Sequence, residues 1–285
     1  MFFERGHYMI KIQACILNVN GKRLIFDEIR EHSLCYITVN EGKFGGLNSD
    51  GIEIIETKWD KVIPTEYGFY IVEDNNKFGL FDQTGTERLP AIYTEISPNV
   101  NEDMIEICID KKIGFYNIEE KYIIEPKYDY ASKFTKGLAK VKINKLYGYI
   151  DKKGNQVIKI KYEWISDFYS DVVKVHIDDK YGYVTRDGFE ILEPEYNEVG
   201  SDGDRYNFYF GRKETKFTCV DRTGKKIFIL DAITGIEEVG EGYKKVPVDI
   251  YEENYEFDSG ISVVKSRGRY TCTRDAVIIA TFYEF

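Results

Sequence analysis

The residue types that most often carry out chemistry are few in this sequence and lie far apart. The three histidines, His7, His32 and His176, form no His-x-x-x-His pair, and no cysteine–histidine cluster has the spacing of a zinc site. The chain also contains no Gly-x-Ser-x-Gly motif, no Walker-type phosphate loop and no dinucleotide-binding fingerprint. We therefore expect no catalytic residues, no metal and no cofactor, and the remaining alternative is an enzyme site assembled from distant segments.

Two patterns resemble functional sites only in part. Residues 200–205 are similar to a calcium loop but lack the later bidentate glutamate, which favours a polar hairpin loop. The carboxylates of Asp178 and Asp179 would point to opposite faces of a strand, so no acid–base role can be assigned to the pair. His176 falls on the exposed face of an alternating strand and is interpreted as a solvated residue.

The cysteines do not predict a disulfide framework. They are odd in number, far apart and without a Cys-x-x-Cys pair: Cys15, Cys35, Cys108, Cys219 and Cys272. We expect them to be small buried hydrophobic side chains.

Charge is unevenly distributed along the chain, whose net charge is −10. Residues 111–161 hold 13 lysines, five acidic residues and no arginine, a net charge of +8. Residues 231–260 hold nine acidic residues against two lysines, a net charge of −7. Lysines can supply nonspecific affinity for phosphate, although specific readout favours arginine. A solvated face that suppresses aggregation of strand edges also explains the basic segment.

The elements that would position any site come from an internal repeat. An aromatic or apolar residue, a glycine and an apolar residue recur around Gly45, Gly79, Gly114, Gly148 and Gly182, at spacings of 34, 35, 34 and 34 residues. Degenerate copies centre on Cys15, Thr218 and Thr271. Three residues after the centre stands an Asn or Asp in most copies, and six residues after it a glycine, which is the chemistry of a tight turn. Fourteen residues after it stands an aromatic residue in the five best copies.

These patterns predict an all-β fold. Period-two alternation and β-branched residues dominate, whereas the helical repeats of similar length need Ala and Leu at helical spacing. A repeat of about 34 residues has room for about three short strands, so we expect antiparallel β meanders in tandem. Residues 1–285 are predicted to form one repeat domain of about eight β units, with an acidic insertion at residues 231–260. The array is expected to be propeller-like or an open twisted solenoid.

The repeats resemble the bacterial WG-repeat family, also written KWG. Lys180-Tyr181-Gly182-Tyr183 is similar to the Lys-Trp-Gly-Tyr step of that family, residues 124–129 to its proline–tyrosine segment, and residues 134–139 to its closing strand. The tryptophan of the motif is replaced, mostly by Phe or Tyr. The resemblance implies a scaffold or recognition module and carries over no catalytic residues.

The acidic insertion is the candidate partner-binding segment. The centres at Thr218 and Thr271 lie 53 residues apart, and insertions in repeat proteins often emerge on the binding face. Its aromatic and acidic side chains suit a hot spot for a basic protein: Tyr251, Glu252, Glu253, Tyr255, Phe257 and Asp258. A long solvated hairpin or a degenerate repeat is the structural alternative.

The sequence therefore predicts a non-catalytic protein-binding module, in a specific version an immunity or inhibitor protein that masks a basic partner. The alternative function is binding of nucleic acid or another anionic ligand through Lys140, Lys142, Lys152 and Lys153. No signal peptide and no apolar run long enough to span a bilayer are visible, so we expect a cytoplasmic protein without a membrane partner.

Overall fold

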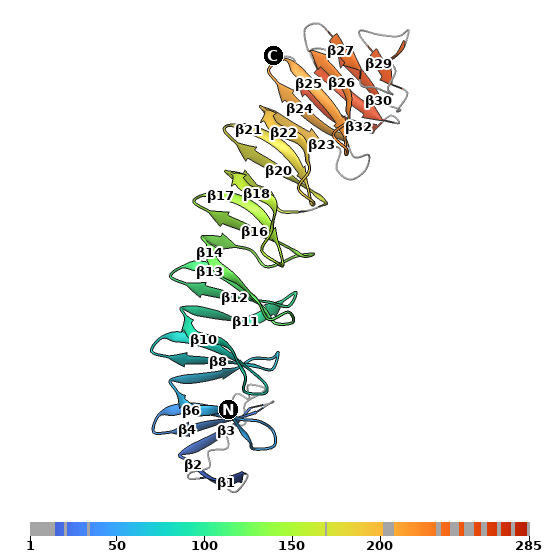
Figure 1. The fold of residues 1–285 in the computed structure, drawn as a ribbon. Helices are drawn as coiled ribbons and strands as arrows, with labels where there is room; N and C mark the ends of the chain where they lie inside the picture. Colours follow the sequence, from blue (N-terminus) through green and yellow to red (C-terminus); the bar gives the residue numbers. More distant parts are fainter. Residues whose placement is uncertain are drawn as a thin grey trace, which may run out of the picture. The chain divides into compact units, whose positions relative to one another are not determined.

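The computed structural model describes residues 15–19, 22–32, 35–168, 170–201, 208–231, 235–239, 245–247, 254–257, 261–266, 269–274 and 277–283. Every regular element among these residues is a β-strand, and the strands form eight antiparallel sheets in which neighbours are consecutive in the chain (Figure 1). No hydrogen-bonded ladder within this part of the chain closes a sheet into a barrel. The prediction of an all-β tandem repeat is confirmed.

The first four sheets consist of β1 (Cys15–Val19) and β2 (Lys22–Phe26); β3 (Glu28–His32), β4 (Cys35–Asn40), β5 (Lys43–Leu47) and β6 (Glu53–Trp59); β7 (Lys61–Pro64), β8 (Phe69–Asp74), β9 (Lys77–Asp82) and β10 (Glu87–Tyr93); and β11 (Glu95–Asn101), β12 (Met104–Ile109), β13 (Lys112–Asn117) and β14 (Ile123–Tyr128).

The next four consist of β15 (Tyr130–Ala131), β16 (Leu138–Ile143), β17 (Leu146–Asp151) and β18 (Gln156–Tyr162); β19 (Trp164–Ile165), β20 (Val172–Ile177), β21 (Lys180–Thr185) and β22 (Glu190–Tyr196); β23 (Glu198–Ser201), β24 (Phe208–Lys213), β25 (Lys216–Asp221), β26 (Lys226–Asp231) and β27 (Gly235–Val239); and β28 (Lys245–Pro247), β29 (Asn254–Phe257), β30 (Ile261–Ser266), β31 (Arg269–Arg274) and β32 (Val277–Tyr283).

The chain divides into two compact units. Unit 1 comprises residues 1–139 with 152–154, and unit 2 comprises residues 140–151 with 155–285. Within the described residues, no helix has the length and apolar character that crossing a membrane requires.

The regular sheet has four strands, so the expectation of about three was wrong. The additional strand is the first of each sheet, which follows the last strand of the preceding sheet after a single residue. These connecting residues are Asp27, Asp60, Thr94, Asp129, Glu163 and Asn197. The first strand escaped the sequence pattern because it is short or bulged: β15 and β19 have two residues each, and β11 shifts register between Ile96 and Val100.

Two kinds of turn join the strands of a regular sheet. Between the second and third strands lies a two-residue hairpin with positive φ at both residues, as at Asn75 (49°) and Asn76 (60°), the geometry of a type I′ turn. Between the third and fourth strands lies the predicted Asx turn. Asp82 Oδ1 accepts hydrogen bonds from the backbone amides of Thr84 and Thr86 at 2.8 and 3.0 Å, and Gly85 has φ of 80°. Both repeat positions are therefore turn determinants, as the sequence indicated.

The central glycine makes room for a bulge in the fourth strand. In one sheet Tyr181 pairs with Tyr196 and Tyr183 pairs with Leu192, so two extra residues of β22 bulge over Gly182. A Cβ at Gly182 would lie less than 3.0 Å from backbone atoms of that bulge. Pro194 sits within the bulge, where no ladder hydrogen bond requires its missing N–H.

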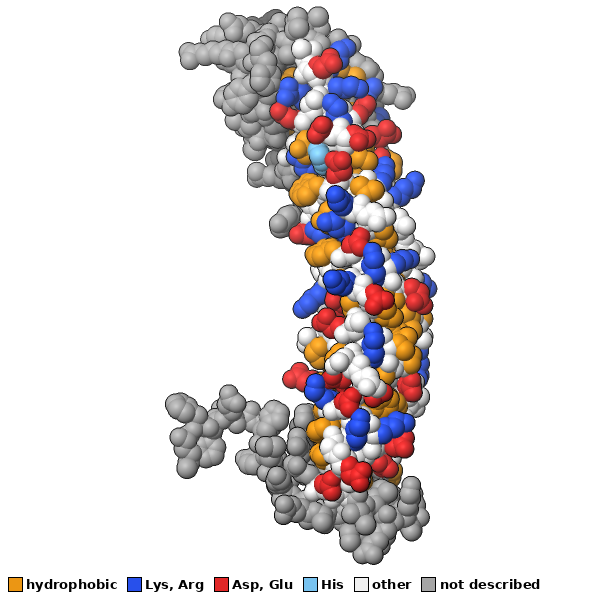
Figure 2. Space-filling view, turned by 90° about the vertical axis from the view of Figure 1, so that its left-hand side faces the viewer, with side chains coloured by type: hydrophobic (Ala, Val, Ile, Leu, Met, Phe, Trp, Pro, Cys, Tyr) orange, Lys and Arg blue, Asp and Glu red, His pale blue; other side chains and the backbone are white. Residues whose placement is uncertain are grey.

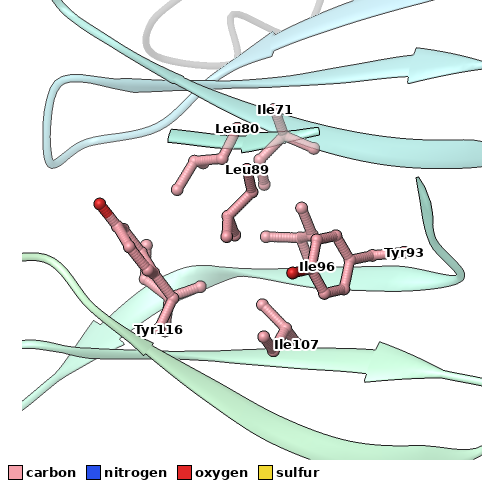
Figure 3. Close-up of a cluster of buried hydrophobic side chains, with 8 residues drawn as sticks. Ile71, Leu80, Leu89, Tyr93, Ile96, Ile107 and Tyr116 are labelled. Atoms are coloured by element: carbon pink, nitrogen blue, oxygen red, sulfur yellow. The ribbon is translucent and has the colours of Figure 1, made fainter. Parts of the chain in front are cut away.

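The hydrophobic core lies between consecutive sheets. In unit 1, buried side chains of the sheet β7–β10 meet those of the sheet β11–β14, and they point toward one another across the gap (Figure 3). The cluster consists of Ile71, Leu80, Leu89, Tyr93, Ile96, Ile105, Ile107 and Tyr116. Burying one such side chain contributes about 1.5–3 kcal/mol. A single four-stranded sheet cannot bury these faces alone, so each sheet depends on its neighbour.

Candidate binding surface

The acidic insertion cannot be located as a surface. Tyr251, Glu252, Glu253 and Asp258 lie outside the described residues. Tyr255 and Phe257 belong to β29, which pairs with β28 and β30, and their side chains are likewise not described. The assignment of these six residues to partner binding stays a prediction.

The four candidate lysines make contacts within the protein. Lys140 Nζ lies 2.5 Å from Asp167 Oδ1, and Lys142 Nζ lies 4.8 Å from the centre of the Tyr147 ring. Lys153 is exposed at the turn after β17. On the face that Figure 2 shows, basic and acidic side chains are interspersed. On this face the described residues therefore do not form the single basic stripe that phosphate binding favours.

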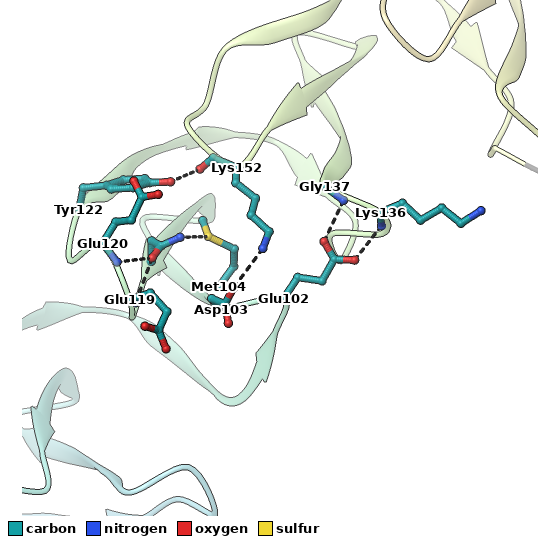
Figure 4. Close-up of polar contacts among 10 residues, drawn as sticks. Glu102, Asp103, Met104, Glu119, Glu120, Tyr122, Lys136, Gly137 and Lys152 are labelled. Carbon is teal, nitrogen blue, oxygen red and sulfur yellow. Dashed lines mark hydrogen bonds and ion pairs between the residues drawn. The ribbon is translucent and has the colours of Figure 1, made fainter.

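Lys152 takes part in a polar network on the loops of unit 1 (Figure 4). Its Nζ lies 3.1 Å from Asp103 Oδ2, and its carbonyl oxygen accepts a hydrogen bond of 2.6 Å from the Tyr122 hydroxyl. Glu102 accepts hydrogen bonds from the backbone amides of Lys136 and Gly137 at 2.7 and 2.8 Å. These contacts join loops of successive repeats, and this role is structural.

Two other expectations need correction. His176 is not a solvated residue, because its side chain is only 21% exposed and its ring centre lies 4.6 Å from that of Tyr181. Asp178 and Asp179 do not lie on opposite faces of a strand. They form the two-residue turn between β20 and β21, with φ of 49° and 57°.

A row of aromatic side chains crosses the sheet β19–β22 in unit 2. The backbone register places Trp164 opposite His176, His176 opposite Tyr181, and Tyr181 opposite Tyr196. We call these four residues the aromatic row. Trp164 at one end is 47% exposed, and Tyr196 at the other end is 8% exposed. Directly opposed residues of an antiparallel sheet share a face, so the row presents an aromatic surface that is open at one end.

Charged side chains border the aromatic row. Glu163 Oε2 lies 3.5 Å from His176 Nδ1, and Lys174 Nζ lies 4.5 Å from the centre of the Tyr181 ring. Burial lowers the pKa of Lys174, and the nearby Glu198 partly opposes this shift. Glu198 in turn holds Arg212 through two contacts of 2.6 and 3.1 Å. An aromatic centre with a charged rim is the composition typical of a protein-binding hot spot.

The corresponding register in other sheets is less aromatic. The sheet β11–β14 carries Glu95 opposite Cys108 and Ile113 opposite Tyr128. The sequence contained a signal at Trp164, sixteen residues after the central Gly148. It could be interpreted only once the first strand of the sheet was known to begin at this residue.

The described residues contain no group of three or more His, Cys, Asp or Glu side chains arranged to hold a metal ion. Cys35 and Cys219 are buried, which agrees with their prediction as small hydrophobic side chains, whereas Cys108 is half-buried. Burial raises the pKa of the Cys35 thiol, although its hydrogen bond with Tyr70 acts in the opposite direction. Cys15 and Cys272 fall where side chains are not described.

Comparisons with solved structures yield only distant similarity. Hsv2p of Kluyveromyces lactis is 7% identical, with 75% of this chain and 73% of that chain covered and a TM-score of 0.26. PorZ, a bacterial surface component of the type-IX secretion system of Porphyromonas gingivalis, is 9% identical, with 85% of this chain and 40% of that chain covered and a TM-score of 0.28. At these scores neither structure contributes to the assignment. No curated protein matches the sequence.

The family described as WG containing repeat matches four consecutive segments, residues 45–78, 78–112, 113–147 and 147–181. Each match begins in the third strand of one sheet and ends at the third strand of the next, so the sequence repeat and the sheet are offset. The matched segments include four of the five central glycines, Gly45, Gly79, Gly114 and Gly148, and the positions that the structure assigns to turns and bulges. Residues 45–181 therefore consist of repeats of the WG-repeat family.

Proposed function

We propose that this WG-repeat protein is a non-catalytic, protein-binding module of the cytoplasm. The observation that carries the proposal is the aromatic row of unit 2, with Trp164 47% exposed at its open end. Tryptophan and tyrosine dominate binding hot spots because they bury a large apolar area and lose little conformational entropy.

The charges around the aromatic row favour a protein over a nucleic acid. Aromatic surfaces also stack nucleic-acid bases, but such sites combine stacking with a positive groove. Here Glu163 and Glu198 lie beside the row, and Lys174 and Arg212 are engaged with the Tyr181 ring and Glu198. Carboxylates at this position repel phosphate and attract a basic protein surface. The acidic insertion also favours a basic partner. In its specific form, the proposed function is that of an inhibitor or immunity protein that masks a basic partner.

The test is affinity capture of a partner with the full chain, followed by measurement of its affinity for two variants. Trp164→Ala should weaken binding by about 30-fold or more, the size of a hot-spot loss. The matched control is Tyr67→Ala, which removes an aromatic side chain that is 51% exposed in unit 1. A partner that binds the wild type and Trp164→Ala equally would sink the assignment to the aromatic row.

A second variant separates the aromatic row from the acidic insertion. Replacing Glu252, Glu253 and Asp258 by Lys reverses three charges outside the described residues. Loss of capture in this variant alone would assign binding to the insertion. Undiminished capture would remove the insertion from the proposal.

A further inference from the structure

A recess of about 520 Å³ opens among the loops of unit 2. Its lining residues come from the end of the loop before β20, from the turn between β21 and β22, and from the turn between β25 and β26. They are Asp171, Thr185, Arg186, Asp187, Phe189, Arg222 and Thr223. The recess is separate from the aromatic row, and it shares no residue with it.

Two guanidinium groups in the recess share one carboxylate. Arg186 Nε lies 3.5 Å from Asp171 Oδ1, and Arg222 Nη2 lies 3.2 Å from Asp171 Oδ2. Both distances exceed the 2.7–2.9 Å or so of a strong charge-assisted hydrogen bond. The Asp171 side chain is also 59% exposed. Asp171 therefore holds each arginine weakly, and a second oxyanion can compete for the same donors.

The first arginine is well positioned. The Arg186 backbone amide donates a hydrogen bond of 2.7 Å to the Asp171 carbonyl oxygen, and its guanidinium lies 4.3 Å from the centre of the Phe168 ring. Its side chain is 23% exposed, against 47% for Arg222. The site thus combines a more buried guanidinium with a more exposed one. Arginine forks match the planar geometry of a carboxylate.

An exposed aromatic ring forms the apolar wall. Phe189 is 48% exposed although it lines the recess. Its ring lies over Gly224, where a Cβ would come within 3.2 Å of Phe189 Cζ. The absence of a side chain at Gly224 therefore lets the ring occupy this position. A ligand that carries an anionic group on an apolar body can contact both arginines and this ring.

The remaining carboxylate of the recess is engaged elsewhere. Asp187 accepts a hydrogen bond from the Thr185 hydroxyl. This bond, more than any other contact, lowers the pKa of Asp187, and the charge of Arg222 contributes in the same direction. Asp187 is thus an ionised neighbour of Arg222, and Asp171 is the carboxylate that contacts both arginines.

The register of the repeat indicates that the arginines are a local specialisation. Arg186 and Arg222 each stand four residues after a central position, and the same position is Lys152 in unit 1 and Ser49 and Gln83 earlier in the chain. Lys152 Nζ lies 3.1 Å from Asp103 Oδ2, and this ion pair between successive repeats corresponds to the contact of Arg222 with Asp171. At the recess, this position holds an arginine with a forked guanidinium group instead of a lysine.

The geometry points to a binding site for a carboxylate attached to an apolar or aromatic body. The anion takes the place of the Asp171 carboxylate between Arg186 and Arg222, and the apolar part lies against Phe189. The same chemistry is offered by a free aromatic acid and by an acidic residue beside a hydrophobic one in a peptide.

Benzoate is the simplest probe, and its binding to the full chain can be followed by NMR or calorimetric titration. Binding in the millimolar range is expected for so small a ligand. Arg222→Gln and Phe189→Ala should each weaken it, the former by about tenfold. Asp171→Asn should strengthen it severalfold, because the internal competitor is neutralised. This gain is the readout that a merely structural role of Asp171 would not produce.

Three comparisons make the test decisive. Lys152→Gln, at the equivalent turn of unit 1, should leave benzoate binding unchanged, and benzamide should not bind. A short peptide with adjacent Glu and Phe that binds at least as tightly as benzoate would identify a peptide as the source of the carboxylate, and benzoate binding without peptide binding would identify a small acid. The proposal is overturned if neither the wild type nor Asp171→Asn binds benzoate or the peptide, if Asp171→Asn brings no gain, or if inorganic phosphate binds as tightly.

Discussion

The ring of Tyr196, the last residue of β22, packs directly against Gly211 of β24. A Cβ at Gly211 would lie 2.5 Å from the ring carbon Cγ of Tyr196. Gly211 pairs with Thr218, the residue that replaces the central glycine of the repeat. The degenerate copy has thus placed a glycine on the opposite strand, where the aromatic residue of the preceding repeat needs the space.

The loss of the central glycine at Thr218 has a matching change in the fourth strand. In the copy around Gly182, two extra residues bulge over the glycine. In the later copy, Phe217, Thr218 and Cys219 pair with Leu230, Ile229 and Phe228 without a shift in register. A side chain is tolerated at position 218 because β26 runs straight past it.

Gly211→Ala should therefore destabilise the protein. The added methyl group forces the Tyr196 ring from its position, and overpacking of this kind costs about 1–3 kcal/mol. The measurement is the urea midpoint of unfolding. Gly200→Ala is the matched control, because a Cβ at Gly200 would meet nothing within 4 Å. Equal midpoints for the two variants would show that the Tyr196 contact is not limiting.

Gly182→Ala should destabilise at least as much as Gly211→Ala. A Cβ at Gly182 would meet backbone atoms of Leu192 and Pro194, which cannot rotate away as a side chain can. Gly46→Ala is the control in the same type of strand, where a Cβ would lie 3.7 Å from the Ile55 side chain. Unfolding followed by circular dichroism should show a clear loss for Gly182→Ala and a small effect for Gly46→Ala. The reverse order would contradict the role assigned to the bulge.

The sequence predicted the parts of the fold that recur at fixed positions. The Asx turn at Asp82 and its glycine at Gly85 follow from local backbone chemistry, which one repeat contains in full. Where the turn glycine is absent, Lys121 takes the left-handed conformation with φ of 59°. The turn is therefore retained in this repeat, although its sequence lacks the turn glycine.

The candidate sites could not be predicted in the same way, because they depend on residues from different elements. The aromatic row needs a two-residue strand that begins at Trp164 and has no alternation of its own. The recess brings Arg186 and Arg222 together from turns of two sheets, although 36 residues separate them in the chain. Neither pattern is visible until the four-stranded sheet and its stacking are known.

Asp82 should make stability depend on acid pH. Burial alone would raise the pKa of Asp82, but hydrogen bonds from Thr84, Thr86 and Arg88 outweigh it and lower the pKa below the ordinary value of 3.8. A lowered pKa in the folded state stabilises the protein above the unfolded pKa, and this contribution is lost as pH falls through the folded value. The free energy of unfolding of the wild type should therefore drop below about pH 4.

The variant that tests this dependence is Asp82→Asn. It cannot ionise and leaves Arg88 without its carboxylate, which holds Arg88 Nε and Nη2 at 2.8 and 2.5 Å in the wild type. It should be less stable than the wild type at pH 7 and should lose less stability between pH 5 and pH 3, a window of about one unit on either side of the carboxyl pKa. Asp50→Asn, at an exposed position in the equivalent turn of another sheet, should retain the wild-type profile. Parallel pH profiles for the wild type and Asp82→Asn would rule out this role for Asp82.

Nucleic acid should bind weakly, because lysines of the basic segment are engaged in contacts within the protein. Lys140 and Lys152 would have to leave Asp167 and Asp103 before they could reach a phosphate. We therefore expect little retention of a generic oligonucleotide even at low salt. Strong retention with a steep dependence on salt concentration would instead support the alternative function through the lysine-rich segment. Lys140→Gln and Lys142→Gln would then be expected to reduce the salt dependence.

The turn between β20 and β21 is open to stabilisation. Asp178 and Asp179 adopt φ of 49° and 57°, a conformation that L-residues other than Asn and Asp rarely adopt and that favours Asn followed by Gly in a type I′ turn. The two adjacent carboxylates also repel each other. Replacing the pair by Asn-Gly should raise the free energy of unfolding by about 0.5–1.5 kcal/mol.

Lys145→Gly makes the equivalent change after Asn144, where φ is 49° and 71° and no like charges are adjacent. A larger gain at positions 178 and 179 than at 145, seen in urea midpoints at low salt and reduced at high salt, would separate charge repulsion from backbone strain. No gain at either turn would mean that the strands, and not their hairpins, set the stability of the repeat.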